Sequence, residues 1–385
     1  MSGIFFCKIC VYPSSKPHIE FNDEGICSGC IAYKRRPKID WNERGLKFKE
    51  ILNHNKKTNP EYYNCIVPSS GGKDSHYQVI KMLEYGMNPL VVNVIPDKLS
   101  ELGRYNIENV KKLGVDTIEI SLNPKIRRRI NKFALETVGD ISWPEHVTIF
   151  TVPVKASVFM KIPLLIWGES AENEIGGPIE AQDANVLDRR WLEEFGGLLG
   201  LRTNDISDIL QIPKEKLTMY TYPSDEELKK NGTMGLFLGQ FLQWDGHENA
   251  LIAEKHGFKP YVKDVEGSIV NYENLDNVYM RIHDYFKFLK YGYDRVTDWC
   301  CTHIRRGRMT REEAVKINQE KSGRFPEEYL GYKISEILKE IDCSREEFIK
   351  ICDKFTNKNL FVCNNKNELI KDDKLNLILK NNEYK

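Results

Sequence analysis

The chain has 385 residues, of which 41% are hydrophobic and 29% charged, so it is long enough for two or three domains with packed cores. Its 56 basic and 56 acidic residues cancel, which counts against nucleic acid as the main partner, because such proteins usually carry a basic surplus. No run of 18 apolar residues occurs, and the first residues lack the apolar stretch of a signal peptide. We therefore expect a cytoplasmic protein without a membrane partner.

Two pairs of cysteines stand near the start of the chain. Cys7 and Cys10 form one C-x-x-C pair, Cys27 and Cys30 form another, and 16 residues separate them. This spacing is typical of a four-cysteine zinc site, in which each pair places two thiolates on one tight turn. An iron–sulfur cluster also uses four thiolates, so the spacing alone leaves iron as an alternative. We expect Zn²⁺ in a closed structural site, held by a module over residues 1–40.

A helix and linker over residues 41–60 lead to a region in which apolar strands alternate with helices. The strands are expected at 64–69, 89–95, 117–121, 162–167 and 218–222, with helices at 74–85, 100–113 and 124–137. Such alternation implies right-handed crossovers and a parallel sheet covered on both faces. The sequence therefore predicts an α/β domain over residues 61–230, built on a doubly wound parallel sheet of about five strands.

The rest of the chain, over residues 231–385, reads as a mainly helical C-terminal region. Helix start signals of the capping-box type recur, in which Ser or Thr is followed three residues later by Glu. They begin at Ser224, Thr310 and Ser344. The tail beyond about residue 364 is rich in Asn and Lys, and its leucines and isoleucines predict a final amphipathic helix.

The most specific segment is Ser70-Gly71-Gly72-Lys73-Asp74-Ser75, between the first strand and the first helix of the sheet. Two glycines let the backbone turn sharply and approach a ligand closely. The following helix N-terminus offers free N–H groups and a positive dipole end, which favour a phosphate group. Lys73 adds a positive charge, and Asp74 can hold Mg²⁺ beside the phosphates. The segment is not a Walker A loop, because Asp74 follows the lysine.

The same six residues are similar to the S-G-G-x-D-S signature of the PP-loop ATP pyrophosphatases. This resemblance implies binding of ATP with Mg²⁺ and its cleavage to AMP and pyrophosphate. It gives Lys73 and Asp74 catalytic roles and makes Ser70, Gly71, Gly72, Lys73, Asp74 and Ser75 ATP-binding residues.

Two further segments are expected beside this loop, because ligands of doubly wound sheets lie beyond the carboxyl ends of the strands. Asn93 lies near the end of the second strand and is predicted to bind ATP. Glu169, Asn173 and Glu174 follow the fourth strand. We predict that these three bind substrate and that Glu169 also takes part in catalysis; an acidic surface loop is the alternative.

Four arginines lie within Arg305–Arg311, next to a predicted helix start. Arginine binds carboxylates and phosphates through paired hydrogen bonds, so Arg305 and Arg306 are predicted to bind substrate. A solvated helix cap explains the same residues equally well. Cys300 and Cys301 are interpreted as packing residues, because nothing in their context indicates a lowered thiol pKa.

Taken together, these motifs resemble the N-acetyl sugar amidotransferases of surface-polysaccharide and flagellar-sugar biosynthesis. The resemblance covers nearly the whole chain. It rests on the two cysteine pairs, Ser70–Ser75, Trp167-Gly168-Glu169, Glu174-Ile175-Gly176-Gly177, Phe241-Leu242-Gln243-Trp244-Asp245 and Arg305–Arg311.

The resemblance implies that an acetamido group of an N-acetylated sugar, such as a nonulosonic acid or a nucleotide-linked sugar, is converted to an acetamidino group. ATP would adenylylate the amide oxygen, and ammonia would then displace AMP. The family also implies partner subunits, resembling a glutaminase and a synthase, that supply the ammonia.

An enzyme of tRNA thiolation is the alternative, because some PP-loop enzymes of that class also carry a cysteine-rich N-terminal module. Such an enzyme needs reactive cysteines near the nucleotide and a basic surface for RNA. Cys65, Cys300 and Cys301 are its weak candidates, and the zero net charge counts against it.

Overall fold

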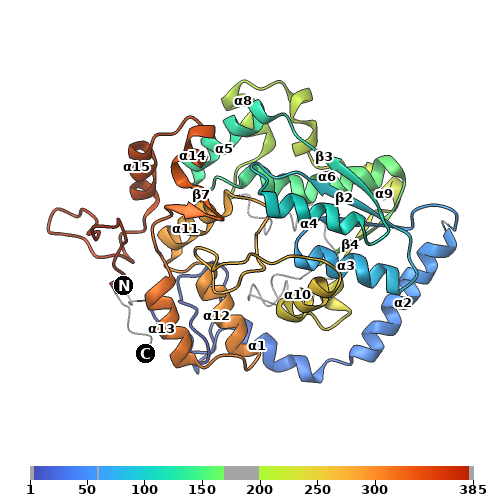
Figure 1. Cartoon of the computed structure of the whole chain (residues 1–385), viewed down its shortest axis with the longest axis horizontal. Helices are drawn as coiled ribbons and strands as arrows, with labels where there is room; N and C mark the ends of the chain where they lie inside the picture. The colour runs from blue at the N-terminus through green and yellow to red at the C-terminus, as the bar shows by residue number, and fades with distance from the viewer. Residues whose placement is uncertain (1–3, 59, 169–198, 381–385) are drawn as a thin grey trace.

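A computed structural model describes residues 4–58, 60–168 and 199–380 of the chain (Figure 1). Its central feature is a sheet of five parallel strands in the order β3-β2-β1-β4-β5. The strands are β1 (Cys65–Ser69), β2 (Pro89–Val94), β3 (Asp116–Ile120), β4 (Leu164–Trp167) and β5 (Met234–Phe237). The chain proceeds from β1 outward to β3, then returns to the other side of β1 for β4 and β5. This order confirms the predicted doubly wound α/β sheet.

Helices cover both faces of the sheet, which is why its inner strands are continuous apolar runs. Ile66 of β1 lies opposite Leu90 of β2 and Leu165 of β4 in the register, and all three side chains are buried. One face packs against α2 (Trp41–Thr58), α3 (Lys73–Glu84), α4 (Glu101–Lys111) and α10 (Gly246–Lys255). The opposite face packs against α6 (Trp143–Met160), which α5 (Pro124–Val138) precedes.

The fifth strand is not where the sequence predicts it. Residues 218–222 were expected to be extended, but η4 (Lys214–Tyr220) is a 3-10 helix that buries Leu217 and Tyr220 beside α5 and α6. The two buried residues are three apart, which suits a helical turn and not a strand. The true strand, β5, is a short Met-Gly-Leu-Phe segment beside β4. The sheet therefore extends past residue 230, where the predicted α/β domain ends.

Beyond the sheet the described chain is mainly helical, as predicted, and surrounds a large apolar cluster of its own. Besides α10, the described α-helices there are α11 (Met280–Tyr291), α12 (Arg295–Arg305), α13 (Arg311–Lys321), α14 (Ile334–Glu340) and α15 (Arg345–Phe355). The predicted capping boxes are present at α9 (Asp225–Asn231), α13 and α15, where the Ser or Thr hydroxyl and the Glu carboxylate each accept a backbone N–H. The other helices among the described residues are α1 (Ser28–Arg35), η1 (Arg36–Lys38), α8 (Thr203–Leu210) and η5 (Leu238–Gln240).

The predicted helix in the C-terminal tail is wrong. Residues 361–379 form tight turns joined by isolated bridges, such as Phe361 with Leu379. Asn364 accepts the backbone N–H groups of Lys366 and Glu368 at 2.9 and 3.0 Å, and Asp372 repeats this pattern further on. Such side-chain bonds to the local backbone favour turns over helices, which the apolar spacing alone does not reveal.

The N-terminal module packs against α12 and α13 and shares one apolar cluster with them. Figure 1 shows the trace of the module beside α12 and α13, although these helices are far from the module in sequence. A segment of this size cannot bury a core alone, so this contact supplies the burial that it lacks. Among the described residues, no helix has both the length and the apolar character needed to cross a membrane. The four-part division of the chain stays a prediction.

Candidate functional site

The Ser70–Ser75 loop follows β1 directly and ends in α3, whose N-cap is Gly72. Gly71 has a φ of +81°, and a Cβ there would lie 2.7 Å from Cγ1 and 2.9 Å from the backbone N of Ile107 in α4. A side chain is therefore excluded both by the backbone conformation and by the neighbouring helix. The close approach of α4 therefore restricts the turn through which the loop enters the N-terminus of α3.

Serine hydroxyls hold the loop in shape. Oγ of Ser75 accepts the N–H of Ser70 at 3.0 Å, and Oγ of Ser69 accepts the N–H of Gly71 at 3.1 Å. Oγ of Ser70 accepts the N–H of Gly72 at 3.3 Å. These bonds use the N–H groups of Ser70, Gly71 and Gly72 to fix the turn. The N–H groups of the first turn of α3, where no N-cap side chain accepts a hydrogen bond, are left to bind an anion such as phosphate.

Lys73 is buried at the start of α3, and its ammonium pairs with the carboxylates of both Asp74 and Glu273. Its Nζ also lies 5.9 Å from the ring centre of Tyr272 and 5.8 Å from that of Trp299. Burial alone lowers the pKa of Lys73, but the two carboxylates outweigh it and raise the pKa above its ordinary value. The site therefore keeps a full positive charge beside the loop.

The carboxylates at this site are themselves held by neighbouring elements. Oδ1 of Asp74 accepts Nδ2 of Asn249 in α10 at 2.9 Å, while its side chain stays partly exposed. Oε2 of Glu273 lies 3.8 Å from Nη1 of Arg295, the first residue of α12. Paired carboxylate oxygens next to an anion-binding loop suit Mg²⁺, which is bound by one or two carboxylates together with substrate phosphates. Asp74 and Glu273 would hold that ion.

Asn93 lies at the carboxyl end of β2, with its Cα in register with that of Ser69. Its side chain is buried, yet neither its amide oxygen nor its nitrogen has a hydrogen-bond partner among the described residues. A buried amide without partners is costly, so it indicates a group that the bound state supplies. This position agrees with its predicted place in the ATP site.

Three predicted residues, Glu169, Asn173 and Glu174, lie outside the described residues. The structure shows where their segment begins: β4 ends at Trp167, next to β1 and at the same edge of the sheet as the loop. Gly168 has no room for a side chain, since a Cβ there would lie 2.3 Å from Nε2 of Gln78 in α3. Their roles in substrate binding and catalysis stay predictions.

Sequence reasoning missed three residues that complete the loop. Glu273 and Asn249 come from distant segments and carry no motif, so only the folded chain reveals them. His76 is different, because it lies on the first turn after the loop and could have been singled out. Its Nδ1 donates to the carbonyl of Gly72 at 3.0 Å, its Nε2 accepts Nδ2 of Asn109 at 3.0 Å, and burial lowers its pKa. His76 is thus a neutral brace for the loop.

The four predicted zinc ligands come together as expected. The Sγ atoms of Cys10 and Cys27 are 3.6 Å apart, and those of Cys7 and Cys30 are 4.0 Å apart. Four sulfurs at the Zn–S distance of about 2.3 Å form a tetrahedron with edges of about 3.8 Å, and a disulfide needs about 2.05 Å. The four buried cysteines therefore fit a zinc ion and exclude disulfides in this arrangement.

Two arginines of the predicted Arg305–Arg311 substrate site face the cysteine module instead of the loop. Nη2 of Arg305 lies 4.0 Å from Sγ of Cys27, and Arg311 donates to the carbonyl groups of Cys7 and Cys10 at 3.2–3.3 Å. Buried cations suit four thiolates around one zinc ion, which carry a net negative charge. A Cβ added at Gly29 would lie only 2.5 Å from Nη2 of Arg305, so a side chain at this position would displace the guanidinium.

Arg306 has a different environment from Arg305. It donates to the carbonyl of Trp244 and pairs with Asp245 at 3.4 Å, and Arg308 binds the same carboxylate at 2.7 and 3.0 Å. These contacts join the Trp244-Asp245 motif to the arginine-rich turn. The substrate-binding roles of Arg305 and Arg306 stay predictions, and the contacts described are internal.

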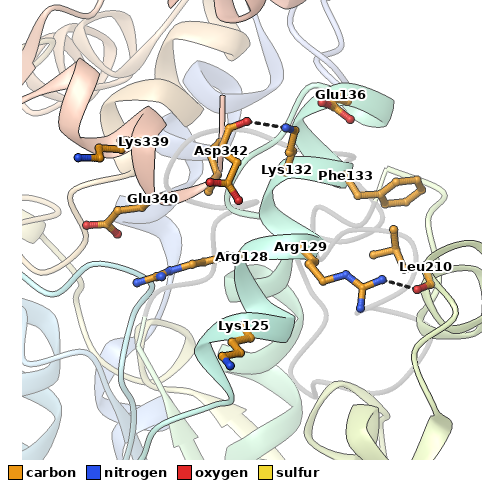
Figure 2. Close-up of a pocket in the computed structure, with 11 residues that line it drawn as sticks. Lys125, Arg128, Arg129, Lys132, Phe133, Glu136, Leu210, Lys339, Glu340 and Asp342 are labelled. Carbon is orange, nitrogen blue, oxygen red and sulfur yellow. Dashed lines mark hydrogen bonds between the residues drawn. The ribbon is translucent and has the colours of Figure 1, made fainter. Parts of the chain in front are cut away.

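A groove of about 560 Å³ lies between α5 and α14, on another part of the surface (Figure 2). The cations of α5 line it, but Lys132 donates to the carbonyl of Asp342 and Arg129 to that of Leu210. Glu136, Glu340 and Asp342 line the same groove, so its charge is mixed.

The fold and loop define an α/β protein with an anion-binding turn at the carboxyl edge of its sheet. Residues 266–374 match the family model described as LPS biosynthesis protein WbpG-like, C-terminal domain. The match confirms, for this part of the chain, the resemblance to proteins of surface-polysaccharide biosynthesis. Glu273 lies within it, so a residue of the matched domain contacts Lys73 of the loop. No curated protein matches the sequence.

Similar solved structures include an NMN synthetase from Francisella tularensis, with 15% identity and a TM-score of 0.28 over 56% of this chain and 87% of that chain. An NH3-dependent NAD synthetase from Campylobacter jejuni has 14% sequence identity and a TM-score of 0.29, over 59% of this chain and 100% of that chain. A predicted subunit of a tRNA methyltransferase from Methanocaldococcus jannaschii has 15% sequence identity and a TM-score of 0.23, over 47% of this chain and 93% of that chain. These values are too low to support any conclusion about this chain.

The conformation of Gly71 can be tested by Gly71→Ala. Left-handed backbone strain costs about 1–2 kcal/mol for any other residue, and overpacking against Ile107 adds about 1–3 kcal/mol. Gly232→Ala is a matched control, because Gly232 has a φ of +68° but no atom within 4 Å of the added Cβ. Chemical denaturation should show a larger loss of unfolding free energy for Gly71→Ala. Equal losses would contradict the close approach of α4.

The metal site can be tested by Cys7→Ser. The variant should lose about one equivalent of zinc and unfold at a lower temperature, because metal binding contributes to folding. Cys363→Ser is the control, since Cys363 lies outside the four-cysteine group. Full zinc content in Cys7→Ser would refute the site.

Proposed function

We propose that the chain is an ATP-dependent amidotransferase that converts an acetamido group of a bacterial surface sugar into an acetamidino group. The observation that carries the proposal is the contact of Lys73 with Glu273. It joins a loop suited to phosphates with the domain that matches proteins of lipopolysaccharide biosynthesis. The ion pair thus links the loop, which suggests ATP chemistry, to the matched domain, which suggests a sugar substrate.

The reaction needs an activation step, because an amide oxygen is a poor leaving group. ATP adenylylates that oxygen, pyrophosphate departs, and ammonia then attacks the carbon as AMP leaves. The turn around Gly71 and Gly72 and the Lys73 ammonium would hold the pyrophosphate, where negative charge develops. Asp74 and Glu273 would hold Mg²⁺ and keep Lys73 in place. Asn93, with its free amide, would contact the nucleotide.

The substrate and ammonia belong to the same proposal. An N-acetylated sugar, such as a nonulosonic acid or a nucleotide-linked sugar, would bind at the carboxyl edge of the sheet near Glu169, Asn173 and Glu174. Ammonia would come from separate glutaminase and synthase-like subunits. The match of residues 266–374 supports the sugar class, since it is the part of the chain similar to a lipopolysaccharide-biosynthesis domain.

The alternative, tRNA thiolation, needs a cysteine that becomes a nucleophile near the nucleotide. Cys65 lies in β1 before the loop, but it is fully buried, and burial raises its pKa to about 12. Cys300 is also buried in α12, and burial raises its pKa as well. Neither environment favours a thiolate at neutral pH. Cys301 is also fully buried and packs with the N-terminal cysteines, so no observation on the described residues favours this alternative.

The proposal is tested by pyrophosphate release from ATP with an ammonium salt and a panel of N-acetylated sugars. We expect release that depends on one class of sugar, together with a product one mass unit lighter because NH replaces O. Release that responds to tRNA and to no sugar would overturn the proposal.

Lys73→Ala should lower sugar-dependent pyrophosphate release by about 100-fold or more, since charge stabilisation at the leaving group is lost. Lys81→Ala is the matched control, because Lys81 lies on the same helix and pairs with Glu84 at the surface. Thermal unfolding of each variant separates loss of activity from loss of fold. Turnover of Lys73→Ala at the level of Lys81→Ala would remove the loop from the mechanism.

Glu273→Gln tests whether the C-terminal region takes part in the site. The amide keeps the size of the side chain but loses its charge, so we expect at least about tenfold less pyrophosphate release and a higher Mg²⁺ requirement. Glu248→Gln, an exposed position on α10, serves as the control. Unchanged Mg²⁺ dependence in Glu273→Gln would contradict its place beside the metal.

A further inference from the structure

A second group of metal-binding side chains lies apart from both the loop and the cysteines. Asp140 lies in the turn after α5, His146 in the first turn of α6, and His283 in the first turn of α11. One donor atom of each residue lies within 4.8 Å of the other two. Three separate elements thus bring two imidazoles and a carboxylate to one point.

The local structure fixes Asp140 between the two histidines. Gly139 ends α5 with a φ of +64°, which turns the chain sharply before Asp140. Oδ1 of Asp140 accepts the backbone N–H of Ser142 at 2.9 Å and lies 2.8 Å from Nδ1 of His283. Oδ2 lies 3.2 Å from Nδ1 of His146. Each carboxylate oxygen therefore faces a different imidazole.

The Nδ1 atom of His146 is buried and makes no well-aligned hydrogen bond among the described residues. It faces the Asp140 carboxylate at 3.2 Å. A buried ring nitrogen without a well-aligned hydrogen bond is costly. A metal ion at this point would satisfy it, since a neutral imidazole binds metals through either ring nitrogen.

We propose that Asp140, His146 and His283 form a second metal site, which takes a divalent transition-metal ion such as Zn²⁺. Two imidazoles and one carboxylate are a common ligand set for such ions, at bond lengths of about 2.0–2.2 Å. These bond lengths place cis ligand atoms about 3.0–3.5 Å apart. The observed separations of 2.8 and 3.2 Å involve a different oxygen of Asp140 in each case, so the carboxylate and the imidazoles would reorient for one ion to reach all three donors.

The site has an inner and an outer side. The Asp140 side chain is 4% exposed, whereas those of His146 and His283 are 20% and 23% exposed. Because the described residues supply three ligands, a fourth coordination position is left for water or a ligand, as in catalytic zinc sites.

Topology places the group at the same edge of the sheet as the loop. The helix α6 leads into β4 after a short turn and packs along the sheet, so it runs antiparallel to the strands. Its first turn, with His146, therefore lies toward the carboxyl ends of the strands. It covers the face opposite α3, so the proposed ion lies apart from the Lys73 carboxylates. This proposal does not depend on the proposed enzymatic function.

A metal-free group, in which two imidazoles only hydrogen-bond to Asp140, is the competing explanation. The full chain is saturated with zinc, desalted and analysed by elemental mass spectrometry. We expect about two equivalents in the wild type and about one in the double variant His146→Asn/His283→Asn. The control His54→Asn changes an exposed histidine of α2 and should keep two. One equivalent in the wild type would overturn the proposal.

Cobalt spectroscopy tests the wild-type chain without any variant. Zinc first fills the four-cysteine site, and Co²⁺ is then titrated into the protein. Binding at Asp140, His146 and His283 should give weak visible bands of nitrogen- and oxygen-bound Co²⁺ without the intense near-ultraviolet bands of thiolate ligands. The absence of visible bands, or bands that persist in the double variant, would overturn the assignment.

Discussion

The ion pairs of Lys73 are the interaction on which the site depends. A buried ammonium is stable only when carboxylates compensate for its lost hydration, and here one comes from the loop helix and the other from the C-terminal region. Asp74 and Glu273 are in turn held by Asn249 and Arg295. The ion pairs therefore hold the α/β sheet and the C-terminal region together at the point where phosphate is expected to bind.

Helix α12 connects this site with the cysteine module. Its first residue, Arg295, binds Asp284 through two hydrogen bonds and approaches Glu273. Trp299, one turn further along, lies near the Lys73 ammonium. The last residue, Arg305, lies against the sulfur of Cys27. A zinc ion in the module would thus stabilise the far end of the helix whose first turns lie beside Lys73.

Much of the fold and part of the site could be predicted from the sequence, because their signals are local. The turn of Gly71 and Gly72, each of the two cysteine pairs and each capping box lie within a few residues. The apolar runs of β1 and β2 mark a sheet buried on both faces. All of these depend on the backbone nearby, so sequence spacing is enough to find them.

What could not be predicted depends on contacts between distant segments. Glu273 has no motif, and only the packing of the C-terminal region brings it to Lys73. Arg305 looks like a phosphate ligand in sequence, but α12 directs it to the cysteines. Residues 218–222 have strand-forming composition, yet residues 214–220 form a 3-10 helix that buries Leu217 and Tyr220. Tertiary packing decided each of these cases against or beyond the local signal.

The central claim is that ATP activates the acetamido oxygen of the sugar, and isotope transfer tests it most directly. A sugar that supports pyrophosphate release is prepared with ¹⁸O in its acetamido group and turned over with ATP and ammonium. The account predicts that the ¹⁸O leaves with AMP, which becomes two mass units heavier. Unlabelled AMP, formed while the sugar is converted, would show that the oxygen is not adenylylated and would contradict the account.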